Sequence, residues 1–324
     1  MLSEESLELI VQDHLAELEW QAGHGPDFAP GSGERDTWND IVLRGRLRNA
    51  VRNLNPDVPE EYLDQAIGEV ITPKSQSAIA ENRRIHQILV EGYRGIEYID
   101  HEGNVQNPTI CFLSSQPHMN DYLSLNQVTV ANLDGERRFD VVCYVNGMPL
   151  AFIELKKTGA NTSIEGAHNQ LQTYVQEFGM AFRFANIAIP SDDLSAKYGT
   201  PFTPWNHFAP WNVDEDGSPV DPNNMVVAGE PVTQLDLLLD GLFNVERFGQ
   251  LYSDFTAFDD TAEGLIMRIA KPHQYFAVTK AVGSTITAAR GDKRAGVIWH
   301  TTGAGKSMEM ELYTAKIMRR TEMH

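Results

Sequence analysis

Two carboxylates and a lysine stand at one end of a predicted β-hairpin, and this combination suits metal-assisted chemistry on phosphate esters. Asp140 opens one apolar run, and Glu154 and Lys156 lie two positions apart in the next, so their side chains share one face. Antiparallel pairing about Asn146-Gly147 roughly aligns Glu154 with Asp140. We therefore predict that Asp140 and Glu154 bind Mg²⁺, which activates the attacking water, and that Lys156 orients that water and offsets transition-state charge.

The apolar flanks of Glu154 distinguish this pattern from a solvated surface strand. Glu-x-Lys alone is a weak signal, but Ala151, Phe152 and Ile153 precede Glu154, so the charges enter a strand that should be buried. Burying charge is costly unless the charged groups have a function. The predicted helix that follows carries Gln170 and Tyr174, which are spaced i,i+4 and share one of its faces.

A second phosphate-binding pattern lies near the end of the sequence. The spacing predicts a short strand at Val297–Trp299, a glycine-rich turn, and a helix from Met308 to Arg320. In such an arrangement backbone N–H groups point at an anion, Lys306 reaches the outer phosphates and Ser307 can bind Mg²⁺. An ordinary glycine-rich turn with a solvated lysine is the alternative. The predicted ATP-binding residues of this turn are Thr302, Gly303, Gly305, Lys306 and Ser307.

A complete motor also needs a second acidic strand to hold the metal, and a full sheet. Only 17 residues follow Ser307 in the 324-residue chain. We therefore expect the ATPase region to be incomplete and expect no ATP hydrolysis by these residues alone.

The periodicity of apolar residues changes from helical to strand-like near Arg94, which predicts a mixed α/β fold. The predicted helices are Leu7–Trp20, Asp40–Asn53, Pro59–Ile71, Gln76–Glu91, Ile164–Phe178, Thr233–Phe248 and Pro272–Arg290. The predicted strands are Ile96–Ile99, Thr109–Leu113, Leu125–Val130, Phe139–Val145, Leu150–Leu155 and Phe184–Ile189, and the predicted loops are Gly23–Gly33 and Asp214–Pro231.

The overall composition is that of a soluble globular protein, with 42% hydrophobic and 22% charged residues. No run of about 18 apolar residues is present, so we expect no membrane span. The acidic, amphipathic start of the chain is unlike a secretory signal. Cys111 and Cys143 lie in apolar runs, which favours buried thiols in a reducing cytoplasm.

The net charge of −19 is unusual for a protein that binds nucleic acid unaided, because such proteins normally carry a basic face. If this protein acts on DNA, we expect other subunits to supply much of the affinity. Local basic groups either converge in space or form solvated faces: Arg44, Arg46, Arg48 and Arg52; Arg83 and Arg84; Arg137 and Arg138; Lys156 and Lys157.

Taken together, these segments resemble the N-terminal region of the R (restriction) subunit of type I restriction-modification enzymes. The resemblance runs over nearly the whole chain and is carried by IVLRGRLRNAVRNLNP, ENRRIHQILVEG, LSLNQVTV, RRFDVVCYVNGMPLAFIELKKTG, AHNQLQTY and IWHTTGAGKS. It implies a PD-(D/E)xK nuclease-like mixed sheet flanked by helices, within an endonuclease domain over residues 1–260 whose first 92 residues are helical. The incomplete start of a RecA-like ATPase/helicase domain would follow over residues 261–324, after a seam at Asp259–Glu263.

The resemblance also implies roles for individual residues. Asp140, Glu154 and Lys156 would be the cleavage residues, with Gln170 and Tyr174 supporting them as in the Gln-x-x-x-Tyr motif of RecB-like nucleases. Lys306 and Ser307 would bind ATP and Mg²⁺.

Two further site residues rest on the same resemblance. Gln274 is similar to the adenine-reading glutamine of superfamily 2 motors, although a surface residue at a helix start would look the same. An acid on the helix before the sheet often completes the metal site in this nuclease group; Glu81 and Glu91 both qualify, and we favour Glu81. We expect His86 on that helix to be a satisfied, partly buried histidine.

The implied function is a metal-dependent DNA endonuclease module of an ATP-dependent type I restriction enzyme. It would cut double-stranded DNA after motor-driven translocation, in a complex with modification methyltransferase and specificity subunits. A RecB-like repair nuclease with a motor is one alternative. A nuclease fold that clamps DNA without cutting it is another, and the intact Asp140, Glu154 and Lys156 argue against it.

Overall fold

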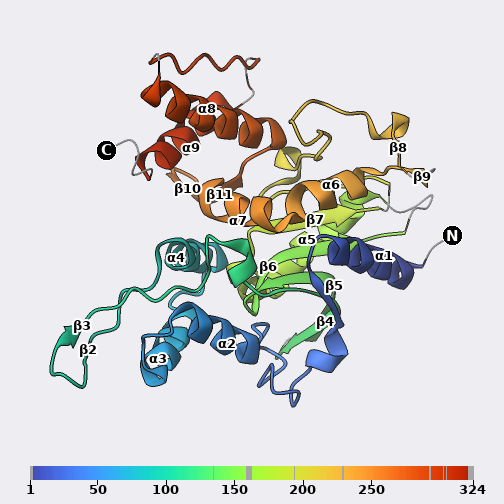
Figure 1. Cartoon of the computed structure of the whole chain (residues 1–324). Coiled ribbons are helices and arrows are strands. Elements are labelled where there is room, and N and C mark those ends of the chain that lie inside the picture. The colour runs from blue at the N-terminus through green and yellow to red at the C-terminus, as the bar shows by residue number, and fades with distance from the viewer. Residues whose placement is uncertain are drawn as a thin grey trace.

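A five-stranded mixed sheet forms the centre of the computed structural model (Figure 1). The structure describes residues 3–133, 135–157, 163–192, 194–227, 230–291, 293–301, 303 and 305–319. In sheet order the strands are β1 (Gln21–His24), β4 (Tyr122–Asn132), β5 (Gly135–Val145), β6 (Met148–Leu155) and β7 (Ile187–Ser191). The central pairs are antiparallel, and β1 and β7 run parallel to their neighbours. The predicted mixed sheet is therefore confirmed.

The β5–β6 hairpin turns where the sequence predicts it. Asn146 and Gly147 have φ of 52° and 77°, and these two positive values are typical of the type I′ turn that joins twisted strands. Gly147 also packs against the backbone of residue 43, since a Cβ there would lie 2.4 Å from the Leu43 carbonyl oxygen. A bulge between Cys143 and Tyr144 then shifts the register by one residue, so that Val141 pairs with Ile153.

Helices cover both faces of the sheet. One apolar cluster joins α5 to Phe139, Val142 and Phe152 on one face. A larger cluster joins the other helices to Val141 and Ile153 on the opposite face. Their bounds are α1 (Glu4–Glu17), α2 (Arg44–Leu54), α3 (Glu60–Ile71), α4 (Ala78–Glu91), α5 (Ile164–Glu177), α6 (Gln234–Phe243), α7 (Val245–Asp254), α8 (Pro272–Arg290) and α9 (Lys306–Met318).

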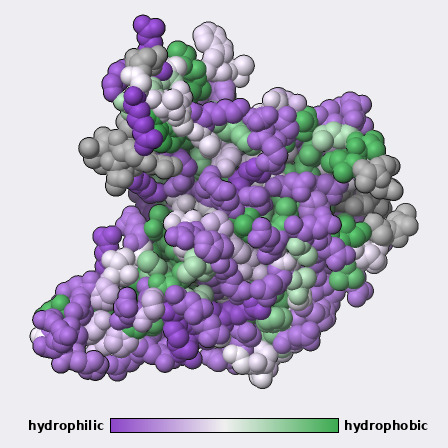
Figure 2. Space-filling model, in the orientation of Figure 1, coloured by the Kyte–Doolittle hydropathy of each residue, from purple (hydrophilic) through white to green (hydrophobic). Residues whose placement is uncertain are grey.

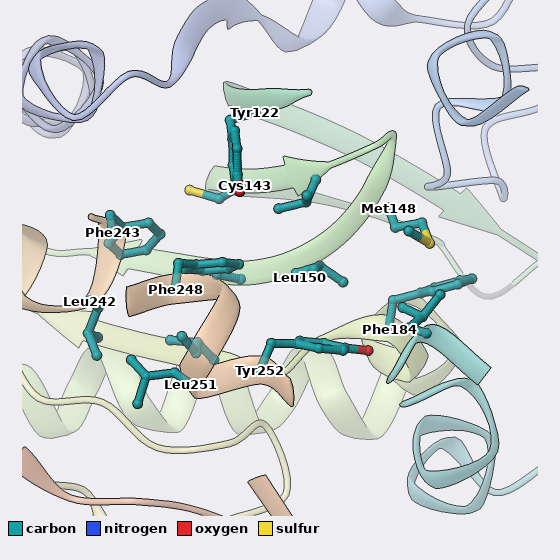
Figure 3. Close-up of a cluster of buried hydrophobic side chains, with 14 of the residues drawn as sticks. Tyr122, Cys143, Met148, Leu150, Phe184, Leu242, Phe243, Phe248, Leu251 and Tyr252 are labelled. Atoms are coloured by element: carbon teal, nitrogen blue, oxygen red, sulfur yellow. The ribbon is translucent and has the colours of Figure 1, made fainter. Parts of the chain in front are cut away.

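Figure 3 shows a portion of the larger cluster, where Phe248 and Tyr252 of α7 lie beside Leu150 of β6. The same cluster continues through Val278 of α8 and Leu312 of α9. The predicted domain boundary at residue 260 falls within a two-stranded hairpin, β10 (Thr256–Thr261) and β11 (Gly264–Ile269). The helices beyond that boundary thus share apolar packing with the preceding region of the chain.

Three predictions at chain connections are wrong. The predicted loop at 23–33 begins with β1, which pairs with β4 and continues into a 3₁₀ turn at Gly25–Phe28. The predicted strand at 109–113 is absent, because Ile110 makes only an isolated bridge with Tyr93. The predicted helix at 233–248 is two helices, since Asn244 ends α6 and its side chain caps α7 by accepting from the Arg247 N–H at 3.1 Å.

Two predictions of burial or strand pairing also fail. Cys111 is exposed, whereas Cys143 is buried as expected. The stretch Val297–Trp299 forms no strand, and both Val297 and Trp299 are 89% exposed. An apolar run becomes a strand only with a neighbour to pair with, and no other described strand lies along this segment.

The arginines of α2 do not form a free basic face. Each has an acidic partner: Arg44 with Asp36 and Asp40, Arg46 with Asp121 and Glu34, Arg48 with Asp64, and Arg52 with Glu60. The face in Figure 2 is mainly hydrophilic, with small, separate hydrophobic areas. No helix among the described residues is long and apolar enough to cross a membrane.

Candidate active site

The hairpin brings the three predicted catalytic side chains together. Asp140 of β5 and Glu154 of β6 occupy neighbouring positions next to the Val141–Ile153 pair. Asp140 Oδ2 accepts a hydrogen bond from the Leu155 N–H at 2.7 Å, and Lys156 Nζ donates to Glu154 Oε1 at 3.1 Å. The backbone of β6 therefore fixes one carboxylate, and the lysine contacts the other.

Burial raises the proton affinity of both carboxyl groups, and the charge of Asp140 adds to this effect at Glu154. Glu154 is only 1% exposed, and burial, followed by the charge of Asp140, raises its pKa to about 8. Burial also raises the pKa of Asp140, against the opposing effect of the Leu155 N–H. Burial alone would lower the pKa of Lys156, but Glu154 and Asp140 outweigh it and raise that pKa. The site thus combines the protonated ammonium of Lys156 with two acids, Asp140 and Glu154, whose pKa values are both raised.

The two predicted supporting residues of α5 contact each other beside this pair. The Gln170 side-chain amide donates to the Tyr174 hydroxyl. Tyr174 is buried, and burial, followed by the charge of Glu154, raises the pKa of its hydroxyl. The structure thus brings Gln170 and Tyr174 to the carboxylate site, as the spacing predicts.

An acid that the sequence analysis missed, Glu8 of α1, also approaches this site. Glu8 is 3% exposed, and its Oε2 accepts from Asn126 Nδ2 at 3.3 Å. Burial, followed by the charge of Asp140, raises the pKa of Glu8. A sequence signal exists: Glu8 and Gln12 are spaced i,i+4 directly beside the apolar stripe of α1, and both are buried.

Glu81, the favoured third acid, lies elsewhere. Its carboxylate pairs with Arg84 at 2.7 Å. Burial alone would raise the pKa of Glu81, but the contacts with Arg84 outweigh burial and lower that pKa. The next residue, Asn82, donates to the Ala185 carbonyl oxygen. The Asn186 N–H in turn contacts the Leu150 carbonyl oxygen near the start of β6. Glu154 lies four residues further on, about 13 Å along an extended strand, so the prediction for Glu81 is corrected.

The other residues of α4 contribute no ligand either. Glu91 is the exposed last residue of that helix. His86 is half-buried between the rings of Tyr252 and Phe258, and its Nε2 lies 2.7 Å from the Tyr252 carbonyl oxygen. The expectation of a satisfied histidine at position 86 is confirmed.

The lysine of the glycine-rich turn hydrogen-bonds the backbone just before that turn. Gly303 and Gly305 have φ of 84° and 83°, which the absence of a Cβ permits. Lys306 Nζ donates to the carbonyl oxygens of residues 300 and 301 at 2.9 and 3.0 Å. Ser307 is exposed in the first turn of α9, while Thr302 lies outside the described residues. Lys306 and Ser307 therefore stand at a helix start, as predicted.

Gln274 is a buried residue that contacts this turn. It is 4% exposed, which excludes the surface alternative. Its Oε1 accepts from the Lys271 N–H at 2.9 Å and so caps α8, while its Nε2 donates to the Gly305 carbonyl oxygen at 3.3 Å. The structure thus brings Gln274 and the glycine-rich turn together.

The oxygen ligands of the carboxylate site determine which metal ions it could bind. Within the described ranges, no group of three or more His, Cys, Asp or Glu side chains is arranged as a metal cluster. Asp140 and Glu154 therefore offer a two-carboxylate site, which suits Mg²⁺ or Mn²⁺ with further oxygen ligands from water or phosphate. A divalent cation would also offset the charge of Asp140, which contributes to the raised pKa of Glu154.

Comparisons with known proteins identify the family of this chain. A family model described as "Type I restriction enzyme R protein N terminus" matches residues 1–207. A second, "SWI2/SNF2 ATPase", matches residues 273–324 and marks the start of the helicase region.

Individual relatives carry related names. The type I restriction enzyme HindI endonuclease subunit of Haemophilus influenzae is 31% identical over 100% of this chain and 31% of its own length. The putative type I restriction enzyme MjaIXP endonuclease subunit of Methanocaldococcus jannaschii is 28% identical over 96% of this chain and 31% of its length. The chain thus spans about a third of these relatives. Because the first family model covers more than half of the chain, the protein belongs to the family of type I restriction enzyme R protein N termini.

Proposed function

We propose that this chain is the nuclease region of a type I restriction enzyme and hydrolyses DNA phosphodiester bonds at Asp140, Glu154 and Lys156. The observation that carries the proposal is the full burial of Glu154 beside Asp140, with Lys156 as the partner of Glu154. A buried acid beside a half-buried one, with a single lysine as partner, is costly for a fold that has no use for them.

The residues of the site divide the work of hydrolysis. Asp140 and Glu154 would hold Mg²⁺, which when bound neutralises the scissile phosphate and lowers the pKa of water. Lys156 keeps its proton, because its pKa is raised, and its Nζ can donate to the attacking oxygen or to the charged phosphate. Gln170 holds the Tyr174 hydroxyl at the edge of the site. Tyr174 can then hydrogen-bond a water or a phosphate oxygen there.

The substrate and partners follow from the family. Relatives named as type I endonuclease subunits support double-stranded DNA as substrate, and modification methyltransferase and specificity subunits as partners. Sequence recognition would then reside on the specificity subunit, and cleavage would follow ATP-driven translocation. The net charge of this chain, −19, supports an arrangement in which other subunits supply much of the affinity for DNA.

A second function, nucleotide binding, is supported by Gln274. Its contact with Gly305 joins the candidate adenine-reading residue to the candidate phosphate loop of Gly303, Lys306 and Ser307. We propose that this region binds ATP with Mg²⁺ in the complete motor. Thr302 belongs to the same proposed loop by its sequence position.

The assembled enzyme allows the two functions to be separated. Glu154→Gln is expected to abolish DNA cleavage and to leave ATP hydrolysis largely intact, because the carboxylate site and the glycine-rich turn use different residues. Lys306→Ala, the matched control, is expected to lose ATP hydrolysis. Undiminished cutting by Glu154→Gln would refute the proposed nuclease site and favour a clamp that does not cut. Cutting that persists without methyltransferase and specificity subunits would favour a free-standing RecB-like repair nuclease.

A further inference from the structure

His300 occupies the first position of the phosphate-loop pattern, where the G-x-x-x-x-G-K-[ST] consensus has glycine. The Nδ1 atom of His300 lies 2.6 Å from Glu309 Oε1, in a hydrogen bond in which the ring nitrogen donates to the carboxylate. Glu309 lies near the start of α9 and is only 3% exposed. A side-chain bond thus joins the entrance of the glycine-rich turn to the helix that follows it.

This bond holds a stretch of backbone that no sheet holds. Residues 297–299, which lead into the turn, pair with no described strand. His300 is contacted instead from two helices. Glu309 of α9 bonds its ring, and the ring of His273 of α8 lies edge-on to it, with the two centroids 5.5 Å apart. Side chains therefore do here what strand pairing does in a complete sheet.

The other end of the turn is held by α8. Gln274 Nε2 donates to the Gly305 carbonyl oxygen at 3.3 Å, and the same oxygen accepts from the Met308 N–H at 3.0 Å. A Cβ on Gly305 would lie 2.3 Å from Gln274 Nε2, so only glycine permits this approach. Each end of the glycine-rich turn is therefore tied to a helix by a side chain.

Lys306 connects the bond at His300 to phosphate binding. Its Nζ donates to the carbonyl oxygens of His300 and Thr301 at 2.9 and 3.0 Å. To bind a phosphate, this lysine has to exchange those oxygens for phosphate oxygens. We propose that His300 is a positioning residue for nucleotide binding: its bond to Glu309 fixes the start of the turn, and through it the place of Lys306. This inference rests on the proposed nucleotide-binding function.

Binding of a non-hydrolysable ATP analogue with Mg²⁺ by the complete, assembled enzyme, measured by calorimetry, tests the inference without any need for hydrolysis. His300→Ala is expected to weaken binding of the analogue about tenfold or more, the usual effect of losing one hydrogen bond to a charged group. In steady-state assays the KM for ATP should rise by a similar factor. The kcat should change little, because the bond exists before nucleotide binds and supports ground state and transition state alike.

Two amide replacements separate the roles of the two ring nitrogens. His300→Asn places an amide N–H near the position of Nδ1, so it can still donate to Glu309 and should keep most of the affinity. His300→Gln places its amide near the position of Nε2 and should bind the analogue as weakly as His300→Ala. Equal affinities of the Asn and Gln variants would overturn the positioning role, because the bond to Glu309 would then not matter.

Glu309→Ala removes the other half of the bond. Its loss of affinity should match that of His300→Ala, and the double variant should be no weaker than either single variant. Glu311→Ala is the matched control, since this carboxylate on the same helix is 56% exposed, and it should bind the analogue like the wild type. Losses that multiply in the double variant would overturn the inference. If Glu309→Ala does not fold, the His300→Asn and His300→Gln pair decides the question.

Lys306→Ala separates failure of this inference from failure of the proposed nucleotide site. If Lys306→Ala abolishes binding of the analogue while His300→Ala binds it like the wild type, the inference is wrong and the nucleotide site stands. If Lys306→Ala binds the analogue like the wild type, the proposed nucleotide site itself is wrong.

Discussion

The carboxylate site and the glycine-rich turn are both predicted from short phosphate-binding patterns in the sequence. The strand that carries Glu154 is paired on both sides, whereas the segment before the glycine-rich turn is paired with no described strand. Glu154 is buried in a strand with neighbours on both sides. The stretch before the glycine-rich turn is unpaired, with Trp299 89% exposed, and Lys306 contacts the carbonyl oxygens of its own loop. The difference teaches that a motif becomes a rigid site only where its flanking strand has found partners.

Hydrogen exchange should give the largest contrast between the two regions. We expect backbone amides of β5 and β6 to be protected at least about a thousandfold more than those of residues 294–301, because the former open only with the core and the latter lack sheet pairing. Native-state exchange measured by mass spectrometry would resolve the two segments. Equal protection would mean that residues 294–301 pair in solution, which would remove the contrast.

The buried acid should make stability depend on pH. The unfolded chain releases the Glu154 proton near its ordinary pKa of 4.5, whereas the folded chain holds it until about pH 8. The free energy of unfolding therefore falls as the pH rises between these two values. The loss amounts to a few kcal/mol, because each pKa unit corresponds to about 1.4 kcal/mol.

Glu154→Gln should remove that loss and raise the free energy of unfolding at pH 8 when no divalent cation is present. Denaturant unfolding of both proteins at pH 5 and pH 8 would measure it. Added Mg²⁺ should stabilise the wild type and not the variant. A variant less stable than the wild type at pH 8 would show that the Lys156 contact outweighs the desolvation of Glu154.

Leu312 tests whether α9 belongs to the same cooperative core as the sheet. Its side chain is buried in the larger apolar cluster, so Leu312→Ala is expected to lower the free energy of unfolding by about 2–3 kcal/mol. The exposed Met310→Ala on the same helix is the matched control. Identical melting of the two variants would mean that α9 unfolds independently of the core.

The smallest effect is expected at the glycine-rich turn. Lys306→Ala should change the stability of this chain by no more than about 0.5 kcal/mol, because the side chain is exposed and contacts only carbonyl oxygens of its own loop. Thermal unfolding would detect a larger change, which would mean that Lys306 already contributes to the fold.

The features of the site that could be predicted are those set by local sequence. A bulge between Cys143 and Tyr144, which counting residues does not predict, places Glu154 rather than Ile153 opposite Asp140, but the hairpin and its approximate alignment follow from the Asn146-Gly147 turn. The spacing of Gln170 and Tyr174 likewise follows from helix geometry.

The rest of the site depends on contacts between distant segments. Glu8 is held at Asn126 only because α1 packs against β4, and the local sequence does not specify that packing. Gln127 of β4 has a φ of 53° within an otherwise extended strand, and this irregularity did leave a trace in the sequence, since the apolar spacing changes from two at Leu123–Leu125 to three at Leu125–Val128. The failure of the Val297–Trp299 strand has the same origin, because pairing partners are not a local property.

The ion pairs of α2 have a consequence for how this chain would meet a polyanion. A free arginine that contacts a phosphate releases a condensed counterion, and each such contact steepens the salt dependence of binding by about 0.9 in log–log slope. Arg46 and Arg48 already neutralise Asp121 and Asp64. To contact DNA they would have to exchange one anionic partner for another, leaving a carboxylate that recruits a cation from solution. The counterions gained and lost would then nearly cancel, so the affinity of this face for DNA should be almost insensitive to salt.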